Sequence, residues 1–263
     1  MRRAPPAAPA RSPTRELVYG RRPVREVIRA GRRQVLELLA SERALAAEPW
    51  LRGTRGLRLS VRPESALTAA AGTRDHQGVV AFCEPYRYGD AYALAEGERP
   101  LIACLDQVTD PHNLGAICRS AEGAGARGVV VPEHNAARVT PAVCRASAGA
   151  VEHVPVAVVV NLARYVSEVK RDDLWVWAAA GDAPTPLWSA DFSAGTVLVF
   201  GSEGRGVRPG VRRVCDDAFA IPLAGRIESL NVSVAAGIAL FEAARQRRRA
   251  TDRYAPLEGE RRA

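Results

Sequence analysis

Short apolar segments alternate with stretches of helical spacing in the second half of the chain, and this alternation most constrains the fold. Five such segments are present: LIACLD (101–106), GVVVP (128–132), LWVWAAA (174–180), VLVFG (197–201) and AFAIPL (218–223). Apolar strands separated by helices are typical of a parallel sheet that is covered on both faces. We therefore expect an α/β domain over residues 100–249, with helices at 113–124, 139–148, 161–170 and 230–249.

The residues outside this domain divide into tails, a small unit and a linker. Residues 1–14 are rich in Pro, Ala and Arg without periodicity, which favours a disordered basic tail. Residues 15–84 predict a small α/β unit, and residues 85–99 predict a linker because they lose periodicity and contain Pro, Gly and charge. Residues 250–263 form a second basic tail.

Within the small unit, helical spacing of apolar residues runs through residues 24–45 and is interrupted near Gly31. Two later segments, GLRLSV (56–61) and GVVAF (78–82), have the composition of strands. A mixed unit of helices and strands is therefore expected in front of the larger domain.

The net charge of +8 is concentrated at the two ends of the chain. Residues 1–34 hold ten arginines and two glutamates, and residues 245–263 hold seven arginines and three acidic residues. Basic ends on a mildly acidic body favour contact with a polyanion such as nucleic acid. Taken by itself, the charge distribution is explained equally well by solvated tails that bind no partner.

Composition argues against a membrane protein and against a metal or disulfide framework. No segment approaches the roughly 18 apolar residues of a membrane span, and MRRAPPAAPA at the start lacks the apolar stretch of a secretory signal. We therefore expect a cytoplasmic protein. The five cysteines form neither a C-x-x-C pair nor a zinc spacing, so no metal is expected.

Three polar or glycine-rich segments directly follow expected strands, which is where ligands bind in parallel sheets. The first is DQVTDPHNLGAICRS (106–120). Asp110 or Asn113 can cap the helix that follows, and Gly115 allows a close approach of the backbone. Asn113 and Arg119 are six residues apart and do not share one helical face, so we expect one in the loop and the other in the first turns.

The second segment, FGSEGRG (200–206), contains three glycines, which allow several amides to turn toward a ligand. It lacks the Lys-Ser/Thr of a phosphate-binding P-loop, and its G-x-x-G-x-G spacing differs from the dinucleotide fingerprint. Glu203 would repel a phosphate. A cofactor without phosphates is therefore favoured.

The third segment, IPLAGRIESLNVSVAAG (221–237), follows a strand that we expect to end at Pro222. Ser229 or Asn231 can cap the apolar helix that begins there. Small residues along 231–239 permit that helix to pack closely against another backbone.

The order N-x-G-x-I-x-R, G-S-E-G-x-G and I-P-x-x-G-x-x-E-S-L-N-V-S-V-A resembles the three motifs of the SpoU branch of the SPOUT RNA methyltransferases, over residues 100–248. At the front, ELVYGRRPVREVI and HQGVVAF resemble the small ribosomal-protein-like RNA-binding domain of the bacterial 23S rRNA guanosine 2′-O-methyltransferases. The resemblance implies an α/β fold with a trefoil-knotted parallel-sheet domain, a homodimer, S-adenosylmethionine as cofactor, and RNA, most directly 23S rRNA, as partner.

Carried over position by position, the motifs assign five catalytic residues: Asn113, Arg119, Glu203, Ser229 and Asn231. The resemblance implies that main-chain groups around four residues hold the cofactor: Gly201, Ile221, Leu223 and Leu230. Leu223 stands where the family usually has Met, which is a near-isosteric apolar replacement.

Methylation of a ribose hydroxyl requires in-line alignment and stabilisation of the developing alkoxide. The family's first-motif arginine has been proposed as the base, but arginine stays protonated. We therefore expect Arg119 to be a cation that binds a phosphate, and Asn113 and Asn231 to orient the ribose. We expect Glu203 to fix Arg119 or its loop, while His112 is an alternative base.

Other functions fit the same motifs. The reaction could act on tRNA, or on a different 23S nucleotide as in antibiotic resistance. A non-catalytic RNA-binding factor in ribosome assembly is a further alternative, although the complete set of motif residues favours an enzyme.

Overall fold

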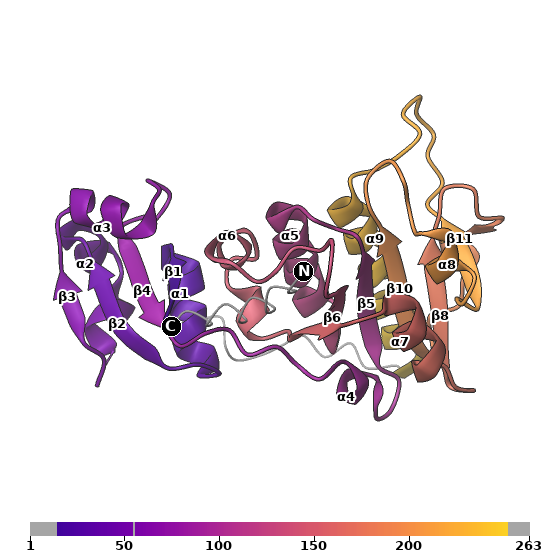
Figure 1. Cartoon of the computed structure of the whole chain (residues 1–263), viewed down its shortest axis with the longest axis horizontal. Helices are drawn as coiled ribbons and strands as arrows, with labels where there is room; N and C mark the ends of the chain where they lie inside the picture. The colour runs from indigo at the N-terminus through magenta and orange to yellow at the C-terminus, as the bar shows by residue number, and fades with distance from the viewer. Residues whose placement is uncertain (1–14, 55, 252–263) are drawn as a thin grey trace, which may run out of the picture. The chain divides into compact units, whose positions relative to one another are not determined.

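The computed structural model describes residues 15–54 and 56–251, which divide into two compact units between Arg87 and Tyr88 (Figure 1). The basic tail expected at 1–14 lies outside the described residues, and so does the tail expected at 250–263 except for residues 250 and 251, which are helical.

The first unit is a four-stranded sheet with helices. Its elements are β1 (Glu16–Tyr19), α1 (Arg21–Ala30), β2 (Val35–Ala40), α2 (Glu42–Ala47), the 3-10 helix η1 (Pro49–Gly53), β3 (Leu59–Val61), α3 (Glu64–Ala71) and β4 (Val79–Cys83). The strand order is β1-β4-β2-β3; β4 runs antiparallel to both of its neighbours, and β2 and β3 are parallel. The carboxyl ends of β1, β2 and β3 therefore meet at one edge of the sheet.

The prediction of helical structure through residues 24–45 is wrong for the middle of this segment, because residues 35–40 form strand β2. Gly31 adopts the left-handed conformation (φ 60°) and ends α1. Beyond it, Leu38 and Ala40 are fully buried between β4 and β3. The apolar periodicity of the segment is compatible with a helix, and pairing with two strands decides the structure.

The second unit is built on a seven-stranded sheet in the order β7-β6-β5-β10-β8-β11-β9, and its strands pair in parallel. Its elements are α4 (Ala91–Ala95), β5 (Leu101–Asp106), α5 (Pro111–Gly123), β6 (Gly128–Pro132), α6 (Pro141–Ala146), η2 (Ala150–Glu152), β7 (Val156–Val159), α7 (Leu162–Val169), β8 (Leu174–Ala179), β9 (Thr185–Pro186), η3 (Leu187–Ser189), β10 (Gly195–Gly201), α8 (Pro209–Arg212), β11 (Asp217–Ala220) and α9 (Val232–Thr251). The expected parallel-sheet α/β fold is confirmed.

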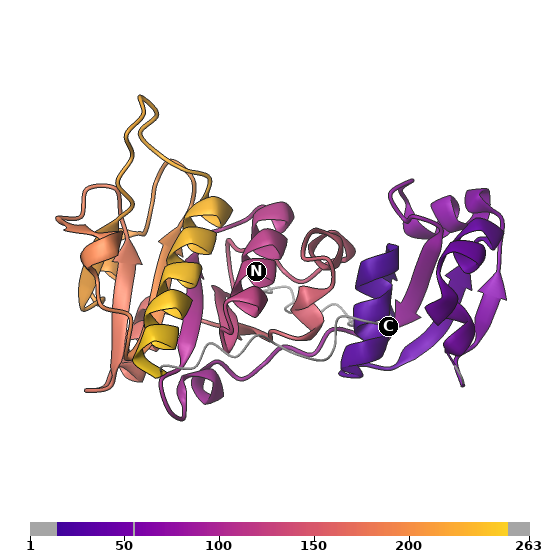
Figure 2. The same cartoon turned by 180° about the vertical axis from the view of Figure 1, so that it is seen from behind.

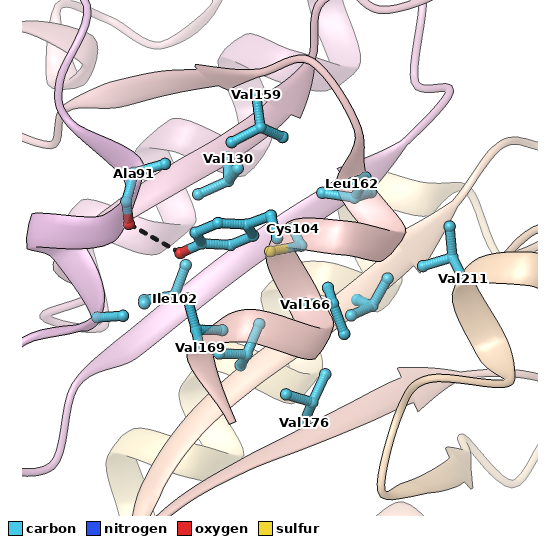
Figure 3. Packing of buried hydrophobic residues seen from close by; sticks show 14 of the residues in the cluster. Ala91, Ile102, Cys104, Val130, Val159, Leu162, Val166, Val169, Val176 and Val211 are labelled. Carbon is cyan, nitrogen blue, oxygen red and sulfur yellow. Dashed lines mark hydrogen bonds between the residues drawn. The ribbon is translucent and has the colours of Figure 1, made fainter. Parts of the chain in front are cut away.

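Helices cover both faces of this sheet. Helices α5 and α9 pack against each other and against strands on one face (Figures 1 and 2). On the other face, α4, α7 and α8 contribute to a core with the strands, in which Ala91, Ile102 and Val166 pack together (Figure 3). The fully buried Tyr165 donates a hydrogen bond of 2.9 Å to the Ala91 carbonyl, so its hydroxyl is satisfied inside this core.

Several elements differ from those expected. Strands β7 and β9 and helices α4 and α8 were not expected, and α4 lies within the segment expected as a linker, where Asp90 caps it. Strand β11 ends at Ala220, not at Pro222. Residues 221–231 are therefore free to form the loop that shapes the site described next.

The cysteines of the described chain are free, and four of the five are buried. Burial raises the pKa of the Cys118 thiol to about 12. Across residues 15–54 and 56–251, no helix combines the length and the apolar composition needed to cross a membrane.

Candidate functional site

Helix α5 carries the first motif. Asp110 caps it by accepting a 2.8 Å hydrogen bond from the His112 backbone N–H. Asn113 lies in the first turn and is buried, whereas Arg119 lies two turns further on and is exposed. The expectation that one of these residues lies in the loop is wrong, because the helix already begins at Pro111.

Gly115 sets the distance between α5 and α6. A Cβ at this position would lie 2.5 Å from the Ala146 Cβ and 2.9 Å from the Ser147 backbone nitrogen. The close backbone approach expected from the sequence is therefore confirmed, and its partner is a neighbouring helix.

The loop after β10 folds back onto the end of its own strand. A Cβ at Gly201 would overlap the backbone of Gly206 and Val207. Gly206 has a φ of 65° and donates a 2.9 Å hydrogen bond to the Ser202 carbonyl. This tight turn needs glycine at both ends.

An ion pair with a buried carboxylate anchors the far end of this loop. Asp106, at the end of β5, is fully buried and pairs in register with Gly201. Arg208 donates its backbone N–H and its Nε to the Asp106 carboxylate, each at 2.8 Å. Because an unpaired buried carboxylate is costly, this contact holds residues 202–207 over the sheet edge.

Hydrogen bonds join one side chain from each of the three motifs. Asn113 and Asn231 both donate Nδ2 hydrogen bonds to Glu203 Oε1, at 2.9 Å and 2.6 Å. Asn231 Nδ2 also donates to Asn113 Oδ1 at 3.0 Å. The remaining acceptor of Asn231, Oδ1, caps α9 by accepting from the backbone N–H and the hydroxyl of Ser233. The orientation of both amides is thereby fixed.

A cavity of about 450 Å³ opens at the carboxyl ends of β8, β10 and β11. Three loops and the start of α9 supply its lining: Ala179–Gly181, Phe200–Gly204, Gly206, Phe219, Ile221, Leu223, Glu228–Val232 and Ala235. Glu203 and Glu228 are its charged side chains, and the described lining contains no Arg or Lys.

The chemistry of this lining selects among ligands. Phe219, Leu223 and Val232 offer apolar contact, and main-chain groups of the loops offer hydrogen bonds. Two carboxylates repel phosphates and attract positive charge. The cavity therefore fits a small ligand with an apolar ring and a cationic group. Among the described residues, no cluster of His, Cys, Asp and Glu is placed to hold a metal ion.

Most residues singled out in the sequence meet here. Seven of them line the cavity: Gly201, Glu203, Ile221, Leu223, Ser229, Leu230 and Asn231. Asn113 joins them through its hydrogen bonds. Arg119 does not line the cavity, and its side chain makes no hydrogen bond or ion pair with any described residue. Glu203 therefore fixes the two asparagines and does not contact Arg119.

Sequence reasoning missed the loop after β8, residues 179–181, and the Asp106–Arg208 pair. The loop could have been found, because it follows an expected strand of the same parallel sheet. The ion pair joins residues 102 positions apart and has no local signature.

Both units match described families. Residues 100–241 match the SpoU rRNA Methylase family, and residues 17–89 match the RNA 2′-O ribose methyltransferase substrate binding family. A 23S rRNA (guanosine-2′-O-)-methyltransferase from Burkholderia sp is 46% identical over 201 residues, covering 75% of this chain and 81% of that protein. One from Shewanella oneidensis is 35% identical over 241 residues, covering 89% and 98%.

A solved structure is similar over both units. The SpoU methyltransferase AviRb from Streptomyces viridochromogenes, in complex with AdoMet, superposes with a TM-score of 0.77 at 28% identity. The superposition covers 89% of this chain and 91% of that chain.

The tight turn after β10 predicts unequal effects of two glycine substitutions. Gly201→Ala should lower the free energy of unfolding by about 3 kcal/mol, because the new Cβ overlaps backbone that cannot move aside. Gly225→Ala, in a loop position with open space, should change it by less than about 0.5 kcal/mol. Urea denaturation measures both. Equal stability of the two variants would contradict the loop geometry.

Proposed function

The chain belongs to the SpoU rRNA methylase family, and from that premise we propose that it transfers a methyl group from S-adenosylmethionine to a guanosine ribose 2′-hydroxyl of 23S rRNA. The observation that carries the proposal is the hydrogen-bonded group of Asn113, Glu203 and Asn231, two of which line the cavity. The match of residues 17–89 to a substrate-binding family supports a structured RNA as the substrate. Such a substrate would place the enzyme in the cytoplasm.

The cavity suits S-adenosylmethionine, whose sulfonium supplies an already activated methyl group. Glu203 and Glu228 complement its positive charges, and the absence of cations from the described lining disfavours phosphate-bearing cofactors. Main-chain groups around Gly201, Ile221, Leu223 and Leu230 would hold the adenine and methionine parts. Leu223 offers the apolar contact that the family usually obtains from Met.

The side chains around the cavity divide the remaining work. Asn113 and Asn231 orient the ribose, and Glu203 holds their amides in place through one shared oxygen. Ser229 lines the cavity and would lie near the reacting centre. Arg119 has no partner within the described chain, so its guanidinium is free to bind a phosphate and to stabilise a developing alkoxide. Water or a phosphate oxygen then takes the proton.

We also propose that the loops at 201–207 and 221–231 form the family's trefoil knot. Residues 201–207 turn back on Gly201 too closely for any side chain there, and this tight turn would form one side of the loop through which the chain is threaded. The ion pair between Arg208 and Asp106 would hold the turn closed.

A homodimer through α5 and α9 completes the proposal. Ser120 approaches Gly237, and Gly123 approaches Phe241, so the two helices run side by side in parallel. Val234 and Phe241 are 50% and 52% exposed and, with Ile238, form an apolar stripe along α9. A second copy is the occupant that the family relationship favours for this stripe.

The direct test of the function uses S-adenosylmethionine carrying a labelled methyl group. Label should enter 23S rRNA at one guanosine ribose and should not enter tRNA, because the similar proteins from Burkholderia sp and Shewanella oneidensis are named 23S rRNA (guanosine-2′-O-)-methyltransferases. Calorimetry should detect binding of S-adenosylmethionine and no binding of ATP, which the two glutamates repel. Label in tRNA alone, or ATP binding without S-adenosylmethionine binding, would overturn the proposal.

The role of Arg119 predicts a graded loss of rate. Arg119→Lys should retain part of the activity, since charge survives while the guanidinium fork is lost. Arg119→Ala should lower kcat by about two to three orders of magnitude if one strong transition-state contact disappears. Arg213→Ala removes another exposed, unpaired arginine of this unit and serves as the control.

The pH dependence of the rate separates a cation from a base. A rising limb that persists in Arg119→Lys indicates another proton acceptor, as proposed. If that limb disappears in both Arg119 variants while Arg213→Ala keeps it, Arg119 is the base and the proposed role is wrong.

The apolar stripe predicts that assembly depends on α9. Sedimentation should find a dimer for the wild-type protein and a monomer for Val234→Asp combined with Phe241→Asp, because two carboxylates would be buried unpaired. Trp188→Asp changes an apolar residue that is 58% exposed outside α9 and should remain dimeric. A monomeric wild-type protein would refute the dimer.

A further inference from the structure

The first unit contains a groove whose charge is opposite to that of the cofactor cavity. It has a volume of about 920 Å³. Four arginines line it: Arg21, Arg43, Arg62 and Arg74. Two glutamates, Glu42 and Glu64, share the lining, so positive charge is in excess.

The position of the groove follows from the sheet. Strands β1, β2 and β3 are parallel to one another, and their carboxyl ends meet at one edge. Arg21, Arg43 and Arg62 directly follow these three strands, so residues far apart in sequence converge there. The first turns of α1 and α3 begin at the same edge and add partial positive charge.

Three of the four arginines are available to a ligand. Arg21 is held in place, because it pairs with Glu48 at 3.2 Å and donates its Nε to the Gln77 carbonyl. Arg43, Arg62 and Arg74 are exposed, and their side chains form no hydrogen bond or ion pair with any residue in the described part of the chain. Like charges gathered in this way favour a polyanionic partner.

The floor of the groove is rigid. His76 is buried, accepts a 3.0 Å hydrogen bond from the Gly78 N–H at Nδ1, and lies 3.0 Å from the Thr68 hydroxyl at Nε2. A Cβ at Gly78 would lie 2.5 Å from Ser41 Oγ, so the turn packs directly on the start of α2. The arginines therefore stand on a fixed frame, which reduces the entropy lost on binding.

We propose that this groove binds the phosphate backbone of the RNA substrate, with Arg43, Arg62 and Arg74 as its phosphate ligands. The proposal rests on the proposed function, which supplies RNA as the polyanion. Arginine forks match phosphate oxygens. Apart from the buried His76, the described lining contains no aromatic side chain on which a base could stack. The contact therefore positions the RNA without reading its sequence.

The test compares two triple variants of the full-length protein. In the groove variant, Arg43, Arg62 and Arg74 are replaced by Ala. In the control variant, the same replacement is made at Arg32, Arg52 and Arg58, which are exposed, lie outside the groove and carry equal charge. Circular dichroism verifies that both retain the wild-type fold, as expected for exposed positions.

Binding of a 23S rRNA transcript is measured across a salt series. The groove variant should bind about tenfold or more weakly at low salt, and the slope of log Kd against log salt should fall by about two to three. Its KM for RNA should rise while kcat at saturating RNA and affinity for S-adenosylmethionine stay at wild-type values. The control variant should keep most of the wild-type affinity and slope.

The outcomes separate this proposal from the proposed function. Wild-type affinity in the groove variant, or equal losses in both variants, overturns the groove as the phosphate site. Salt-dependent RNA binding by the wild-type protein without methyl transfer overturns the proposed function and leaves the groove comparison valid.

Discussion

The site depends on a tight turn of the backbone after Gly201, where no side chain can be tolerated. Strand β10 delivers the chain to the edge of the sheet, and the loop turns back at once over the strand end. Arg208 then reaches the buried Asp106 on the neighbouring strand, which closes the turn. Only with this turn in place does Glu203 reach the two asparagines, because it lies between the two fixed points.

The two units present opposite charge to their ligands. The cavity of the second unit is lined by carboxylates and main-chain groups, whereas the groove of the first unit is lined by arginines. Phosphate groups are therefore disfavoured inside the cofactor cavity, and the proposed binding of RNA phosphates falls to arginines outside it. On that proposal, a cationic cofactor and a polyanionic substrate do not compete for one site.

The sequence predicted the parallel sheet of the second unit well, because buried strands such as 101–106 and 128–132 are apolar without interruption. The prediction failed for residues 35–40, which form a strand and not a helix. Their apolar spacing is compatible with both structures, and pairing with neighbouring strands determines which one forms. The end of β11 was also misplaced, since Ile221 and Leu223 look like strand residues although they line a cavity.

The residues of the site could be predicted from the sequence, but the hydrogen bonds among them could not. Motif spacing identified Asn113, Glu203 and Asn231, and the sheet edge explains why they meet. Their hydrogen bonds join residues that are 28 to 118 positions apart, and a local sequence pattern does not predict contacts over such separations. The resemblance to a family identified which residues belong to one site, and the structure shows which of them form hydrogen bonds with one another.

The sequence does not distinguish the partners of Arg119 and Arg208, whereas the structure does. Arg208 donates to a carboxylate that is fully buried, so its charge is already compensated within the fold. Arg119 is exposed on the same helix as Asn113 and has no partner in the described chain. An exposed cation without a partner costs little in water, and its attraction to a phosphate becomes stronger where water is excluded. The proposed role in the reaction therefore falls to Arg119, whereas Arg208 holds the loop.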